Sequence, residues 1–174
     1  MLSVAEDEVH RKKLLRIVQK WYHPKTIARS ANSILPRVRV LLVEDFEPFR
    51  ALIKSLINDV PSLQLVCEAA DGLVAVEKTE ELSPDLILLD IGLPGLNGIE
   101  VGRRIRGLLG NSKIVFVTQE SSPEVVQEAL SLGSCGYILK SRARSDLLPA
   151  IEAVLRGNQY VSDGLAGYDS TELE

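Results

Sequence analysis

The chain has 174 residues, of which 45% are hydrophobic and 25% charged, as in a soluble globular protein with one ordinary domain and some extra length. The formal net charge is −4, but residues 1–36 carry seven Lys or Arg against three Asp or Glu, so the remainder is strongly acidic and a poor candidate for binding nucleic acid. Two cysteines without CxxC spacing exclude a disulfide framework, and no apolar stretch is long enough to cross a bilayer, so we predict a cytoplasmic location.

The first 37 residues differ from the rest and are predicted to form a basic amphipathic helix followed by a linker. In residues 9–22, Leu14, Val18 and Trp21 recur every three or four positions, which is the spacing of one helix face. Residues 26–37 are polar and contain proline, as linkers do. Such a helix could bind a protein partner, a membrane surface or nucleic acid, or mediate dimerisation. The preferred interpretation is a mobile solvated segment that function does not require.

From Val38 onward the predicted strands and helices alternate. Five βα units within about 120 residues predict a doubly wound α/β domain with right-handed crossovers, covering residues 38–161. Residues 162–174 are predicted to form a flexible tail. The predicted strands are 38–43, 63–69, 85–89, 113–117 and 136–139, and the predicted helices are 46–59, 72–82, 97–108, 122–132 and 143–156.

Polar side chains follow four of these strands at the point where each strand ends. Asp90 follows an aliphatic run that suits a strand covered on both faces. Glu44 and Asp45 follow the first strand, Thr118 the fourth and Lys140 the fifth. Because open α/β sheets bind ligands at the carboxyl ends of their strands, we expect these groups to meet in one crevice. Each residue alone also fits an ordinary role as a helix cap, loop residue or solvated charge, but those roles explain the joint pattern poorly.

This pattern resembles the receiver domain of bacterial two-component response regulators over about residues 38–161. The residues that carry the resemblance are Glu44-Asp45, Asp90 with Leu93-Pro94 and Asn97-Gly98, Thr118, Tyr137 and Lys140. The resemblance implies a flavodoxin-like five-stranded parallel sheet in the order 2-1-3-4-5, with the first and third strands side by side at the crevice.

The resemblance also implies that Asp90 is the phosphoacceptor, a carboxylate nucleophile that forms an acyl phosphate. An aspartate carboxylate is ionised at pH 7, so this chemistry requires no general base. Carboxylate oxygens are ligands that Mg²⁺ prefers, so Mg²⁺ is the expected cofactor. By resemblance, Asp45 and Asp90 bind the metal directly, Glu44 acts through water, and the backbone carbonyl of Gly92 is a further ligand.

In the mechanism that the resemblance implies, Lys140 pairs with one phosphoryl oxygen and the Thr118 hydroxyl donates to another. The movement of Thr118 makes space for the aromatic ring of Tyr137 to turn inward, and the surface around the last two helices changes. A simple packed aromatic is almost as good an interpretation of Tyr137.

Three positions depart from the common pattern of the family. The acidic pair begins with Glu44 where many receivers have aspartate, which lengthens one arm of the metal site. Ser141 follows Lys140 where many receivers have proline, so no cis peptide is expected there. Glu120 places an acid near the mouth of the site, where it is expected to hinder small anionic phosphodonors or alter the lifetime of the phosphoryl group.

The local sequence around Asp90 resembles that of receivers that precede a helix-turn-helix transcription domain. No stretch of about 60 residues, the usual size of such a module, follows the fifth predicted helix, so the prediction is a stand-alone receiver. The implied partners are a sensor histidine kinase or a histidine phosphotransfer protein, and a downstream protein. Homodimer formation stays open, whereas direct DNA binding by the receiver and membrane binding are not expected. The domain is not predicted to be an ordinary enzyme, but Mg²⁺-dependent self-phosphorylation and autodephosphorylation are expected.

Two other functions stay open. The first is a phosphate-independent interaction module that keeps the fold and has lost the switch, although Asp90, Thr118 and Lys140 argue against it. The second is a Mg²⁺-dependent phosphohydrolase, which would need an additional acid or base and a substrate pocket that the sequence does not plainly show.

Overall fold

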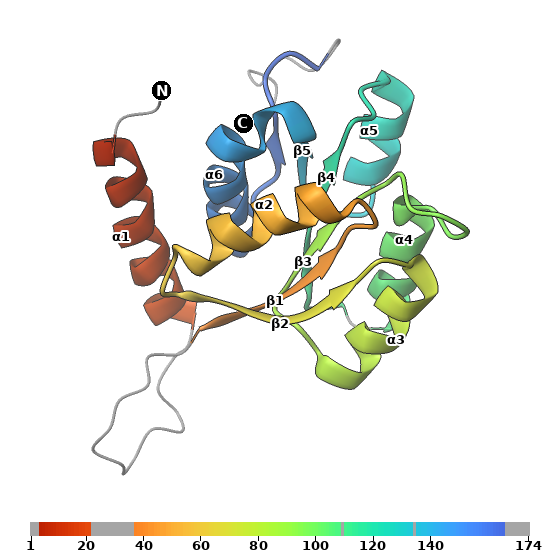
Figure 1. Cartoon of the computed structure of the whole chain (residues 1–174), viewed down its shortest axis with the longest axis horizontal. Helices are drawn as coiled ribbons and strands as arrows, with labels where there is room; N and C mark the ends of the chain where they lie inside the picture. The colour runs from red at the N-terminus through yellow and green to blue at the C-terminus, as the bar shows by residue number, and fades with distance from the viewer. Residues whose placement is uncertain (1–3, 22–36, 109, 134, 166–174) are drawn as a thin grey trace.

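The computed structural model describes residues 4–21, 37–108, 110–133 and 135–165, which form an α/β fold around one parallel sheet (Figure 1). Every strand and helix predicted between residues 38 and 156 is present, with ends shifted by at most two residues. The strands are β1 (Val38–Val43), β2 (Leu63–Ala69), β3 (Leu86–Leu89), β4 (Lys113–Thr118), β5 (Cys135–Leu139) and β6 (Tyr160–Val161). The helices are α1 (Val4–Trp21), α2 (Glu47–Asn58), α3 (Gly72–Leu82), α4 (Gly98–Leu108), α5 (Pro123–Leu130), the short 3₁₀ helix η1 (Lys140–Arg142) and α6 (Ala143–Leu155).

The sheet has the order β2-β1-β3-β4-β5-β6, and every neighbouring pair of strands is parallel. This agrees with the predicted flavodoxin-like class and strand order, except that the sheet has six strands where the sequence predicts five. The central strands β1, β3 and β4 are almost entirely buried, because helices cover both faces of the sheet.

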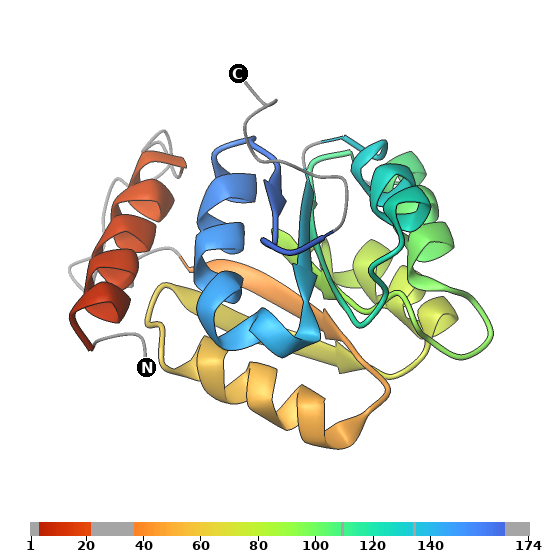
Figure 2. The ribbon, with the colours of Figure 1, turned by 90° about the horizontal axis from the view of Figure 1, so that it is seen from above.

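The helices form two layers, one on each side of the sheet, as Figure 2 shows. Helices α2 and α6 cover one face and share a hydrophobic core with α1, which lies on the outer side of α6. Helices α3, α4 and α5 cover the other face around a second core. No helix in the described ranges combines the length and the apolar character that crossing a membrane requires.

Helix α1 corrects the preferred interpretation of the N-terminal segment as mobile and solvated. Leu14 is 0% exposed and Ile17 is 7% exposed, and both belong to the core that α6 contributes to. Burying two such side chains stabilises the docked helix by roughly 1.5–3 kcal/mol each, while Lys12 and Lys13 stay exposed to water. The side chains of Val18 and Trp21 and the predicted linker at 26–36 lie outside the described residues.

The sixth strand pairs with β5, and a buried carboxylate also holds the chain that follows α6. Asp146 in the first turn of α6 accepts hydrogen bonds from the hydroxyls of Ser162 at 2.5 Å and Ser145 at 2.6 Å, and from the guanidinium of Arg142 at 2.9 Å. The Ser162 hydroxyl in turn accepts a hydrogen bond from the backbone N–H of Leu139 at 3.2 Å. Ser162 and Leu165 are both buried, so packing continues past residue 161, where the sequence predicts a flexible tail.

We expect Asp146→Asn to lower the free energy of unfolding by about 1–3 kcal/mol, because the amide loses charge-assisted hydrogen bonds in a buried site. Burial alone would raise the pKa of Asp146, but hydrogen bonds from Arg142, Ser145 and Ser162 outweigh burial and lower it. A lowered pKa in the folded protein stabilises the fold at neutral pH, and the contribution is lost as the pH falls through that lowered value. Urea unfolding should therefore show a difference between wild type and variant that shrinks in acid.

The matched control is Asp163→Asn, since Asp163 pairs with the same Arg142 at 3.5 Å but its side chain is 80% exposed. An exposed pair of this kind contributes less than about 1 kcal/mol. Equal losses of stability in the two variants would contradict a special role for the buried carboxylate.

Candidate functional site

Strands β1, β3, β4 and β5 end at the same edge of the sheet. Val43 pairs with Leu89, and Leu89 pairs with Phe116, so the residues that follow these strands leave the sheet side by side. Thr118 pairs with Leu139 at the end of β5. The register therefore brings the predicted site residues of four different segments to one rim.

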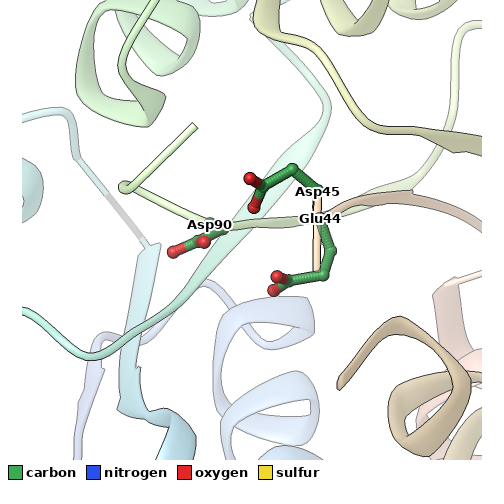
Figure 3. Close-up of side chains that lie close together, drawn as sticks. All are labelled: Glu44, Asp45 and Asp90. Atoms are coloured by element: carbon green, nitrogen blue, oxygen red, sulfur yellow. The ribbon is translucent and has the colours of Figure 1, made fainter. Parts of the chain in front are cut away.

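Three carboxylates gather at this rim. Oxygens from Glu44, Asp45 and Asp90 all lie within 4.8 Å of one another, and Figure 3 shows the three side chains close together. Glu44 is 1% exposed and Asp90 is 5% exposed, whereas Asp45 is exposed to solvent. The cluster therefore has a buried side and an open side, and Asp45 forms the open one.

The ammonium of Lys140 compensates the charge of the two buried carboxylates. Its Nζ lies 2.8 Å from Oδ2 of Asp90 and 2.8 Å from a carboxylate oxygen of Glu44. The same nitrogen lies 4.9 Å from the ring centroid of Phe49, a favourable cation–π contact. Burial alone would lower the pKa of Lys140, but its hydrogen bonds to Asp90 and Glu44 and their negative charges raise it, so the amine stays charged.

Hydrogen bonds hold both the backbone and the carboxylate of Glu44 in place. Its backbone N–H donates to the Ala69 carbonyl at 2.9 Å, and one oxygen of its carboxylate accepts from the N–H of Phe46 at 3.1 Å. Burial raises the pKa of Glu44 and the nearby charge of Asp90 raises it further, whereas the hydrogen bond from Lys140 opposes both. The carboxylate is therefore fixed in place.

The donor set fits a magnesium ion. Mg²⁺ prefers oxygen ligands and usually takes one or two carboxylates together with waters and substrate oxygens. Asp45 and Asp90 offer such oxygens from neighbouring strand ends, and Oδ1 of Asp90 accepts a hydrogen bond from the N–H of Gly92 at 3.1 Å, which fixes the carboxylate in direction. Asp45, Asp90 and the carbonyl of Gly92 would hold the ion, with Glu44 behind them.

Thr118 and Tyr137 both form hydrogen bonds with the backbone of Glu120. The Thr118 hydroxyl accepts from the Glu120 N–H at 3.2 Å, and the Tyr137 hydroxyl donates to the Glu120 carbonyl at 2.9 Å. Tyr137 is fully buried, so its ring is already packed inside the domain in this structure, and its role as a switch stays a prediction. Burial raises the pKa of Tyr137, with the charges of Glu120 and Asp90 adding to it, so its hydroxyl stays a donor.

The side chain of Glu120 is directed to helix α5. Its Oε1 accepts from the backbone N–H groups of Ser121 and Ser122, both at 2.9 Å. These hydrogen bonds, that of Ser122 foremost, lower the pKa of Glu120. The carboxylate thus holds the two residues that precede α5, whereas the side chain of Ser122, at the N-cap position, makes no capping hydrogen bond.

Two residues of the site, Phe49 and Arg50, were not predicted from the sequence. Phe49 and Arg50 lie in the first turn of α2, where Phe49 contacts Lys140 and the Arg50 guanidinium donates to the Glu44 carbonyl at 2.6 Å. Helical spacing from Asp45 would have placed both near the site. Gly98 is predicted as part of the resemblance and of the helix 97–108, but not for its close packing: a Cβ at this position would lie 2.0 Å from the carbonyl oxygen of Asp90.

Comparison with known proteins agrees with the resemblance. The family model of the response regulator receiver domain matches residues 40–152. The chain is 36% identical over 126 residues to the nitrate/nitrite response regulator protein NarL of Escherichia coli (strain K12), covering 72% of this chain and 58% of NarL. It is 32% identical over 130 residues to the transcriptional regulatory protein LiaR of Bacillus subtilis (strain 168), covering 75% of this chain and 62% of LiaR. The match therefore spans less than two thirds of these relatives.

Solved structures show the same fold. A two-component response regulator of the LuxR family from Aurantimonas sp. SI85-9A1 has a TM-score of 0.71 and 34% identity, covering 78% of this chain and 97% of that one. The response regulator domain of Thermotoga maritima CheB has a TM-score of 0.63 and 32% identity, covering 69% and 97%. Both similarities extend over nearly the whole of the other chain.

We expect Gly98→Ala to destabilise the protein by about 1–3 kcal/mol, because the added methyl group forces α4 and the Asp90 backbone apart. Gly107→Ala in the same helix is the control, since a Cβ there meets no atom within 4 Å. That change should be neutral or stabilise the helix by up to about 1 kcal/mol. Chemical denaturation measures both, and amide shifts at Asp90 and Gly92 should move only in Gly98→Ala. Equal stability and unchanged shifts in the two variants would contradict the close approach.

Proposed function

This chain belongs to the response regulator receiver domain family, and we propose that it accepts a phosphoryl group on Asp90 and signals through a change of its surface. One observation carries the proposal: Lys140 Nζ lies 2.8 Å from Asp90 in a cluster that also contains Glu44 and Asp45. The cluster combines a fixed carboxylate nucleophile, a cation to neutralise the incoming phosphate, and an open carboxylate for a metal ion.

The proposed donor is a phosphohistidine of a sensor histidine kinase or of a histidine phosphotransfer protein. An oxygen of the Asp90 carboxylate attacks the phosphorus atom, and the bond between phosphorus and the histidine nitrogen breaks as the new phosphorus–oxygen bond forms. The histidine ring leaves with the electron pair and is protonated from solvent. In autodephosphorylation, water attacks the phosphorus atom and Asp90 leaves as a carboxylate.

Lys140 and Asp45 act at different points of this step. Lys140 gives up part of its interaction with Asp90 and pairs with a phosphoryl oxygen, which compensates the negative charge that the phosphate brings. Bound Mg²⁺ would supply the additional positive charge that lets an anionic donor approach three carboxylates. The open position of Asp45 leaves the cluster accessible from solvent.

The proposed signal passes through Glu120. When the Thr118 hydroxyl turns to the phosphoryl group, its hydrogen bond with the Glu120 N–H is disturbed. The Glu120 carbonyl is bound to Tyr137, and the Glu120 carboxylate holds the residues that precede α5, so both the buried ring and the start of α5 respond. The surface around α5, β5 and α6 would then differ between two states of one fold.

We propose protein–protein contact as the output of the domain, and the cytoplasm as its location. Residues 37–174 carry eight more acidic than basic charges, which disfavours direct DNA binding by the domain itself. The names of NarL and LiaR describe those proteins as regulators, LiaR as a transcriptional one. A stand-alone receiver stays a prediction, which the length of the native polypeptide in cells would test.

A phosphate-independent interaction module is the alternative. The geometry favours a working switch over it, because two buried carboxylates paired with a lysine are costly to keep in a surface used only for docking. Turnover of an exogenous phosphoester would instead favour a phosphohydrolase.

With Mg²⁺ and acetyl phosphate, intact mass should show a single phosphoryl adduct that survives acid and is lost in alkali. Asp90→Asn should abolish the adduct because it removes the nucleophile. Asp45→Asn is the matched control: the acceptor remains, so the adduct should form more slowly and need more Mg²⁺. An adduct that persists in Asp90→Asn would contradict the assignment. A wild-type protein that forms neither this adduct nor a beryllofluoride complex would favour the interaction module.

Thr118→Ala should keep the adduct but lose much of the amide shift change that phosphorylation causes, because the link from the site to Glu120 is removed. Thr118→Ser keeps the hydroxyl and should respond almost as the wild type does. Nuclear magnetic resonance spectra recorded with and without beryllofluoride measure this response. Identical responses in the alanine and serine variants would show that the hydroxyl does not transmit the signal.

A further inference from the structure

Arg50 contacts the backbone of the acidic turn, whereas Lys140 contacts the Glu44 side chain. The Arg50 side chain is 17% exposed, and its guanidinium donates to the Glu44 carbonyl at 2.6 Å. We propose that Arg50 is a positioning residue that shapes the Glu44–Asp45 turn so that its carboxylates can receive a divalent cation. This inference rests on the proposed function, since it concerns the metal site of the phosphoacceptor.

The turn needs such a partner because it leaves β1 before α2 has begun. Strand β1 ends at Val43 and helix α2 starts at Glu47, so the carbonyl of the buried Glu44 lies outside both elements. A buried carbonyl without a donor is costly. Arg50 supplies the donor, and the Glu44 N–H is already bound to Ala69, so both backbone groups of Glu44 are fixed.

Asp45 depends on this arrangement more than Glu44 does. The Glu44 carboxylate has its own anchors in Lys140 and the Phe46 N–H. Among the described residues, none donates a hydrogen bond to the Asp45 carboxylate, so its direction is set by the backbone that precedes it. The peptide between Glu44 and Asp45 is the one whose oxygen Arg50 holds. Arg50 therefore orients the open arm of the site without touching it.

Arg50 is itself held by acidic side chains. Its Nε lies 3.5 Å from Oε2 of Glu68 on β2. Its Nη2, the terminal nitrogen that does not bind the Glu44 carbonyl, pairs with Glu47 in the first turn of α2. Glu68 precedes Ala69, the residue that accepts the Glu44 N–H. The end of β2 thus fixes the turn twice, once directly and once through Arg50. A guanidinium suits this position because its planar fork can bind several acceptors at once.

The sign of the effect separates positioning from simple electrostatics. A positive charge beside a cation site repels the cation, so removing that charge should strengthen Mg²⁺ binding if Coulomb forces alone decide. If Arg50 acts by holding the turn, its removal should weaken binding. Groups that orient metal ligands typically affect affinity by tenfold or more.

The experiment is calorimetric titration of the whole chain with Mg²⁺ alone, comparing wild type with Arg50→Met and Lys54→Met. Lys54 is the matched control, since it lies one turn further along α2 and binds the same Glu68 at 2.8 Å. Both changes remove one positive charge and one ion pair with Glu68. We expect Arg50→Met to bind Mg²⁺ about tenfold more weakly. Lys54→Met should bind as tightly as the wild type or slightly more tightly.

A third variant, Arg50→Lys, keeps the charge and removes the fork. It should also bind Mg²⁺ more weakly, although less so than Arg50→Met. Urea unfolding of each variant separates weaker binding from loss of the fold, and Arg50→Lys serves as the test if Arg50→Met does not fold. Equal or stronger Mg²⁺ binding in the folded Arg50 variants would overturn the inference while leaving the proposed function intact. A wild-type protein that binds no Mg²⁺ would overturn both.

Discussion

The contact of the Lys140 ammonium with two buried carboxylates is the interaction on which the rest of the site depends. Asp90 and Glu44 are almost fully buried, and two ionised carboxylates in such a place repel each other. Lys140 compensates both charges at 2.8 Å from each carboxylate, and the parallel sheet makes the contact possible by ending β1, β3 and β5 at one edge.

This arrangement divides the site into a fixed part and an open part. Glu44, Asp90 and Lys140 hold one another, and Arg50 holds the backbone between Glu44 and Asp45. Asp45 stays exposed and free to meet a cation from solvent. On the other side, the backbone of Glu120 joins Thr118 to Tyr137 and α5. A charge added at Asp90 would therefore be compensated by the fixed part and sensed through Glu120.

The fold and the proximity of the charged groups could be predicted because both follow from simple rules. Aliphatic runs alternate with helical segments, and the carboxyl ends of parallel strands meet at one edge. The details that depend on side-chain packing could not. Tyr137 is buried because its ring fits beside Phe116 and its hydroxyl finds the Glu120 carbonyl. Strand β6 is two residues long, and Ser162, which follows it, binds Asp146, a contact that no local pattern predicts.

The most direct test of this account is a crystal structure of the protein with Mg²⁺ and beryllofluoride, which mimics the phosphoryl group. We expect beryllofluoride on the Asp90 carboxylate, with Lys140 moved from Asp90 to a fluorine atom and the Thr118 hydroxyl turned to the same group. A structure in which Asp90 stays bare at saturating beryllofluoride and Lys140 keeps both carboxylates would contradict the claim that this cluster is a phosphoacceptor site.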